Sequence, residues 1–143
     1  AVGMDYRFYQ DSWDITAHTL NLNYTYPLKT HPGWILSLEY RYYTQTQANF
    51  YSDLFPHANA QNFLARDKEL SPFTHHSIGF QAEYGYDIKN IQWLDRGQIA
   101  TSLYYNQYNY DDFRDLRNTS TPGSEPLYSF DAWVSQFYLS VWF

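Results

Sequence analysis

Two side chains with the chemistry of a hydrolase lie close together in the segment THHS, residues 74–77. In an extended strand His75 and Ser77 point to one face and His76 points to the other. Nucleophilic catalysis would also need an acid to orient the histidine and donors for an oxyanion, and the spacing supplies neither. We therefore predict no enzymatic activity, and keep a lipid-modifying hydrolase that uses His75 and Ser77 as an alternative.

A run of acidic residues could bind a cation. The segment YDDFRDLRN brings together Asp111, Asp112 and Asp115, and carboxylates at this density could bind Ca²⁺ or join divalent bridges to lipopolysaccharide. The full spacing of a calcium loop is absent, and Arg114 and Arg117 offer partners nearby. We expect a solvated, locally salt-bridged loop that holds no metal and no other cofactor.

A second charged segment is ARDKEL, residues 65–70, in which the charges alternate in sign. This pattern is typical of a segment whose side chains pair with one another. We expect an ordered loop here with a helical turn, and we select Asp53, Arg66 and Asp67 as its most informative positions.

These residues are positioned by segments in which polar and apolar side chains alternate. In residues 33–45, for example, Trp34, Leu36 and Leu38 alternate with Ser37 and Glu39. This period of two predicts strands, and helical spacing is missing throughout. The pattern predicts strands at residues 3–10, 15–27, 33–45, 73–87, 98–110 and 131–143.

The composition is unusual for a packed soluble core. Aromatic residues make up 22% of the 143 residues, with 16 Tyr, and only 17% are charged. Amphipathic rings suit a boundary between hydrocarbon and water. The net charge of −6 argues against a nucleic-acid partner, which would call for a basic stripe. No stretch reaches the roughly 18 consecutive apolar residues of a transmembrane helix.

The strand pattern favours an antiparallel up-and-down transmembrane β-barrel. Several predicted strands exceed a dozen residues, longer than the mode of about 5 to 6 in globular proteins. Only six strands are visible, whereas single-chain bacterial barrels start at about 8. We therefore expect residues 1–143 to form one segment of a larger barrel, with long extracellular loops at 48–72 and 111–130.

The polar face of these strands would line the lumen. Its predicted lumen-facing residues are Arg7, Glu39, Arg41, Gln81, Glu83 and Asn106. They could select solutes by charge or brace the lumen as a salt-bridge network, and we favour the network because charges of opposite sign in balance create a weak field. A simple hairpin around the 48–72 loop would place Arg41 diagonally opposite Gln81 and Glu83.

The stretches LEYRYYTQTQANFYSDLFP and NFLARDKELSPFTHHSIGF resemble the C-terminal region of an uncharacterised family of larger bacterial outer-membrane barrels, a domain of unknown function. The resemblance is strongest over residues 38–80. It implies a barrel fold and a longer protein, and brings no activity with it. The chain also ends with an alternating pattern that looks like the signal read by the barrel-assembly machinery: Phe137, Leu139, Val141 and Phe143.

Together these patterns predict a non-enzymatic β-barrel of a Gram-negative outer membrane, acting as a porin-like pore or as a scaffold in an outer-membrane assembly. Its expected partners are outer-membrane lipid, lipopolysaccharide, the barrel-assembly machinery and further outer-membrane subunits. A soluble antiparallel β binding protein remains the other alternative, and it should not need detergent.

Overall fold

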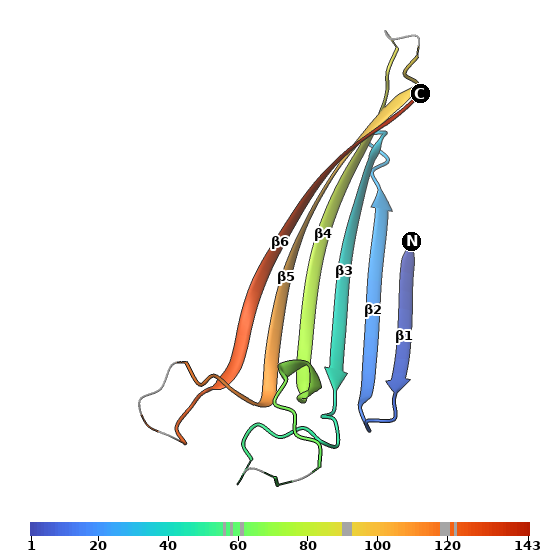
Figure 1. The fold of residues 1–143 in the computed structure, drawn as a ribbon. Helices are drawn as coiled ribbons and strands as arrows, with labels where there is room; N and C mark the ends of the chain where they lie inside the picture. Colours follow the sequence, from blue (N-terminus) through green and yellow to red (C-terminus); the bar gives the residue numbers. More distant parts are fainter. Residues whose placement is uncertain (56, 58, 61, 90–92, 118–120, 122) are drawn as a thin grey trace.

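A computed structural model describes residues 1–55, 57, 59–60, 62–89, 93–117, 121 and 123–143 (Figure 1). The strands are β1 (Val2–Gln10), β2 (Thr16–Pro27), β3 (Trp34–Gln45), β4 (Phe73–Asp87), β5 (Arg96–Arg114) and β6 (Leu127–Trp142), and one 3-10 turn, η1, spans Lys68–Leu70. All six strands form one antiparallel sheet in which each pairs with its neighbour in sequence. The predicted all-β antiparallel fold is confirmed.

The strand boundaries agree with the period-two pattern except around the last connection. β5 runs on to Arg114 and β6 begins at Leu127, so the connection covers 115–126 rather than the predicted 111–130. Backbone bonds explain the extension: Asp111 N–H donates to Pro72 O at 3.0 Å and Asp115 N–H to Pro126 O at 2.9 Å. A register shift between Asn109 and Arg114 interrupts the regular pairing there, where the sequence is too polar to resemble a strand.

The connections are distributed unequally between the two ends of the sheet. Antiparallel order places the described residues of 11–15, 46–72 and 115–126 at one end, which we call the loop end, and those of 28–33 and 88–95 at the other, the turn end (Figure 1). The predicted long loops therefore share one end. Within the described residues, no helix is long and apolar enough to cross a membrane.

The two faces of the sheet differ in chemistry across all six strands. One row of the pairing register joins Leu22, Tyr40, Ile78, Tyr105 and Trp133, and defines the apolar face. The row one residue away defines the polar face and joins Asn21, Arg41, Ser77, Asn106 and Ala132. Pairing keeps every apolar run on one side, as strand alternation requires.

In β2 to β5 the polar face is more buried than the apolar face, the reverse of a sheet that packs on a hydrophobic core. On the apolar face Phe80 is 49% exposed and Trp133 67%, whereas Ser77 and Ser102 on the polar face are 9% and 6% exposed. The buried hydrophobic cluster lies at the loop end instead, where Ile15, Ala48 and Tyr51 pack together. Its partly buried neighbours are Phe50, Leu70 and Phe113. No described element covers the apolar face of the sheet.

The polar face is shaped by one close fit between a glycine and a ring. Gly79 lies opposite Tyr104, and a Cβ at Gly79 would collide with the Tyr104 ring. The ring therefore lies across β4, where its hydroxyl donates to Glu39 Oε2 at 3.0 Å. A larger residue at position 79 would displace the ring and break that bond.

Gly79→Ala is expected to lower the free energy of unfolding by about 1–3 kcal/mol, the usual cost of overpacking. Gly85→Ala is the matched control in the same strand, since nothing lies within 4 Å of a Cβ there. Denaturant unfolding of both variants in detergent micelles measures the difference. Equal stabilities would show that Tyr104 moves aside without cost.

Candidate functional site

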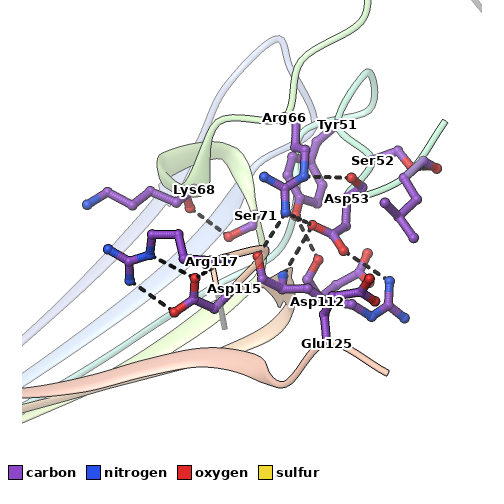
Figure 2. Close-up of polar contacts among 12 residues, drawn as sticks. Tyr51, Ser52, Asp53, Arg66, Lys68, Ser71, Asp112, Asp115, Arg117 and Glu125 are labelled. Carbon is purple, nitrogen blue, oxygen red and sulfur yellow. Dashed lines mark hydrogen bonds and ion pairs between the residues drawn. The ribbon is translucent and has the colours of Figure 1, made fainter. Parts of the chain in front are cut away.

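A densely bonded polar cluster lies at the loop end and centres on Asp53. This carboxylate is 2% exposed and contacts two arginines: Arg66 Nη2 at 2.8 Å and Arg114 Nη1 at 3.0 Å. Figure 2 shows Arg66 and Asp53 facing each other beside Tyr51. A buried carboxylate needs such partners, because an unpaired buried charge is strongly destabilising.

The two arginines tie the long loop to the end of β5. Arg66 Nε donates to the carbonyl of Asp53 at 2.8 Å, and its Nη2 donates to the carbonyl of Arg114 at the same distance. The guanidinium also lies over the ring of Phe113, 4.5 Å from its centroid. The backbone N–H of Arg114 donates to Asp53 Oδ1 at 3.2 Å. One ion-pair cluster thus connects the long loop to the end of β5, across 61 residues of sequence.

Tyr51 packs beside the same cluster. Its side chain is 3% exposed, and its hydroxyl donates to the carbonyl of Asp112 at 2.8 Å. Burial, followed by the negative charges of Asp53 and Asp112, raises the pKa of Tyr51 to about 12. The folded loop therefore favours the neutral phenol.

Tyr51 is expected to titrate about two pH units above an ordinary tyrosine. Because the raised pKa belongs to the folded loop, this contribution to loop stability is complete below pH 10 and is lost as the pH rises through about 12. NMR of protein labelled with ¹³C at tyrosine Cζ measures the titration, with Tyr51→Phe identifying the resonance. A midpoint near 10 for Tyr51 would contradict the burial of its hydroxyl.

The acidic residues of the second loop are distributed over different contacts. Asp115 accepts two bonds from Arg117, at 2.8 Å from Nε and 3.0 Å from Nη2, so this predicted local pair is present. Asp111 and Asp112 use backbone groups, donating to Pro72 and accepting from Tyr51. Arg114 was expected to pair locally, and pairs with Asp53 instead. The prediction extends over residues 118–120 and 122, which lie outside the described residues.

The prediction that ARDKEL pairs within itself is wrong for its arginine. Arg66 pairs with Asp53, and the local ion pair of the segment is a 3.9 Å contact between Lys68 and Glu69. Asp67 precedes η1, and its side chain makes no capping bond. Asp53 and Arg66 are therefore brought together, and Asp67 stays apart from them. Among the described residues, no group of three or more His, Asp or Glu side chains is placed to hold a metal ion.

The carboxylates of the polar face are held by neutral donors. Glu39 accepts from the Tyr104 hydroxyl, and Glu83 accepts from the amides of Gln81 at 2.6 Å and Gln98 at 2.5 Å. In the described part of the chain neither carboxylate forms an ion pair. The predicted salt-bridge network on this face is therefore wrong, and amide and phenol groups satisfy the acids instead.

The expected neighbours of Arg41 are also corrected by the register. Arg41 lies opposite Ser77, while Gln81 lies opposite Ser37 and Glu83 opposite Ile35. The two polar residues are thus four and six positions further along β4. All the predicted polar-face residues do share one face. In the register Asn106 lies opposite Ser77, and Arg7 of β1 lies opposite Thr19 of β2.

The histidines divide between the two faces as alternation predicts. His75 Nε2 lies 3.1 Å from Asn106 Oδ1, and its ring stacks on Tyr108 with centroids 4.2 Å apart. His76 lies on the apolar face, where its Nδ1 is 2.9 Å from the Tyr40 hydroxyl. The hydrolase alternative requires an acidic side chain beside His75. The group that contacts its ring nitrogen is instead the side-chain amide of Asn106.

Comparison with known families decides where the chain belongs. A family described as "Protein of unknown function (DUF3570)" matches residues 1–118. The chain belongs to the DUF3570 family. No curated protein and no solved structure matches it. The DUF3570 match includes residues 38–80, which carry the resemblance noted in the sequence, and it contains both the Asp53 cluster and the polar-face residues of β1 to β5.

Two residues of the DUF3570 chain that matter to these clusters were not selected from the sequence. Arg114 was noted only as a local partner, and no sequence pattern links it to Asp53 across 61 residues. Tyr51 shares a segment with Asp53, yet a single tyrosine among 16 gives no distinguishing pattern. Gly79 could have indicated that a large side chain such as Tyr104 packs against β4, because a glycine inside a strand often marks a place where another group approaches the backbone closely.

Proposed function

We propose that this chain is part of a β-barrel in the outer membrane of a Gram-negative bacterium, where it serves as a transmembrane pore or as a scaffold for an outer-membrane assembly. The observation that carries the proposal is the inverted burial of the sheet. Its apolar face carries exposed large side chains on all six strands, and in β2 to β5 its polar face is the more buried one. That pattern is expected when hydrocarbon surrounds a sheet that encloses a polar interior.

The aromatic residues of the apolar face support a membrane of ordinary thickness. The rings of Trp34 and Tyr84 contact each other in a tilted arrangement near the turn end, with centroids 5.0 Å apart, and those of Tyr42 and His76 do so near the loop end at the same distance. Between these bands, Phe80 lies beside Leu38 and Leu103. The eight steps from His76 to Tyr84 span roughly 26 Å of strand. At a tilt near 40° that gives about 20 Å, comparable to the apolar band of such barrels.

The free edges of the sheet favour a larger barrel. β1 and β6 each pair on one side within the described sheet. Exposed backbone groups at an edge cannot be satisfied in lipid, so further strands must pair with both edges. They would come from more of the same polypeptide or from other subunits. Assembly through the last strand would use Phe137, Leu139 and Val141, which lie on the apolar face, followed by Phe143.

Recording from a planar bilayer tests the proposal. Full-length protein purified in detergent should insert and give steady conductance steps, because the polar face would border a wet lumen. A folded barrel that stays silent would favour the scaffold over the pore. Protein that remains dispersed and folded without detergent would contradict the membrane location and favour a soluble binding protein.

A second candidate, the scaffold, is favoured by an apolar groove at the loop end. Trp13, Phe50, Phe63 and Leu64 line a groove of about 500 Å³, and Phe63 is 76% exposed. An exposed apolar groove of this kind often binds a partner. A scaffold should lose its co-purifying outer-membrane subunit when Phe63 is replaced by serine, and a pore should not.

A further inference from the structure

Two arginines of the polar face converge on one groove near the loop end. Its volume is about 240 Å³, and it is lined by Arg7, Tyr9, Ala17, Thr19, Arg41 and Tyr43. The register explains the geometry: β2 supplies the floor with Ala17 and Thr19, which are 3% and 8% exposed. Arg7 rises from β1 on one side and Arg41 from β3 on the other. Small buried residues between two long cationic ones leave room for a ligand.

Within the part of the chain that the structure describes, the other four arginines make ion pairs or a ring contact, whereas Arg7 and Arg41 make neither. Arg66, Arg114 and Arg117 pair with carboxylates. Arg96 lies over the ring of Trp142, 5.0 Å from its centroid. In the described residues, neither Arg7 nor Arg41 makes a hydrogen bond or an ion pair through its side chain.

The nearby acids are already engaged by neutral donors. Asp5, the acid closest to Arg7 on the same face, accepts from the Asn21 amide at 3.2 Å. Asp11 accepts from the Tyr9 hydroxyl at 3.1 Å, and Glu39 accepts from Tyr104. Each of these acids thus accepts a hydrogen bond from a neutral donor, and the N–H groups of the two guanidinium groups remain available to a ligand. Each guanidinium carries five N–H donors in a planar fork that fits a carboxylate or a phosphate.

We infer that Arg7 and Arg41 form a binding subsite for oxyanions on the polar face of the sheet. The ligand class is a carboxylate or phosphate group carried by a small solute, bound through the donors of both arginines. This inference rests on the proposed function, because it assigns the solute class that a lumen lined by this face would attract. The position near the loop end would place the subsite at the outer mouth of the barrel.

Arginine labelling of the full-length protein in detergent tests the subsite without any need for conductance. Phenylglyoxal should modify Arg7 and Arg41, and inorganic phosphate or succinate should protect both, as peptide mass spectrometry would show. Arg66, which is held by Asp53, serves as the internal control and should label slowly with or without the anion. Labelling of Arg7 and Arg41 that neither anion slows would overturn the inference.

Bilayer recordings under a salt gradient provide the second measurement. Phosphate should block the wild-type pore, and Arg7→Gln or Arg41→Gln should weaken that block about tenfold, since a charge-assisted hydrogen bond is lost. Lys29→Gln removes the same charge at the turn end and should change little. Phosphate block that is unchanged in both arginine variants contradicts the subsite. A silent barrel contradicts the pore alone, and the labelling result then decides the subsite.

Discussion

Asp53→Asn is expected to release the long loop from the end of β5 while leaving the sheet folded. The substitution keeps the shape of the side chain but removes the charge that holds Arg66 and Arg114 at 2.8 and 3.0 Å. Breaking a buried ion pair costs about 3–5 kcal/mol. Because the two arginines are 30% and 35% exposed, we expect a smaller loss of about 2–4 kcal/mol.

Hydrogen exchange measures this loss where it occurs. The amides of Ser52 and Ala65 bond across the loop, and their exchange should become about a hundredfold faster in Asp53→Asn. Amides of β2 and β3 should keep their rates. Asp67→Asn is the matched control, since it removes a carboxylate from the same loop that caps nothing. Equal exchange in the two variants would show that the cluster does not order the loop.

An ordered loop end would matter to either proposed role. The Asp53 cluster fixes residues 48–53 and 65–71 against β5, and Gln45 Nε2 adds bonds to the carbonyls of Glu69 and Ser71. The groove formed by Trp13 and Phe50 belongs to the same folded unit. Releasing the loop would therefore disturb a partner site directly, and would change the entrance to the Arg7 and Arg41 groove only indirectly.

The strands and their faces were predictable because the signal is local and repeated. In β3 and β4 apolar and polar residues alternate at most of a dozen positions, so the pattern tolerates exceptions such as Ile35 and Tyr43. His76 shows this well, since alternation alone placed it with Tyr42 on the apolar face.

Partners across the sheet were not predictable, because pairing register depends on connections whose geometry the sequence does not reveal. Residues 46–72 are long enough to permit many registers between β3 and β4, and the expected contact of Arg41 with Glu83 was wrong by several residues. The same limitation hid the Asp53 cluster, whose members come from the long loop and from the distant end of β5. The charge pattern within ARDKEL suggested local ion pairs. Arg66 instead pairs with Asp53, because that buried carboxylate needs a cationic partner.

Phe80→Arg is the substitution that most directly tests the membrane assignment. Phe80 lies in the middle of the apolar face, between Leu38 and Leu103, and is 49% exposed. In lipid, an arginine near the bilayer midplane costs about 2–4 kcal/mol. Folding into vesicles, followed by denaturant and by the heat-dependent shift on gels, should show that loss of stability and a lower yield.

The neighbouring residue separates lipid from water as the cause. Gln81→Arg introduces the same charge one position along β4, but on the polar face, where it would meet water and Glu83. It should fold with nearly unchanged stability. A soluble sheet would give a different outcome, because an arginine at the half-exposed position 80 would then be solvated and cost little beyond the lost ring contacts. Equal stabilities of the two variants would therefore reject the membrane barrel and leave the soluble binding protein as the better account of the exposed apolar face.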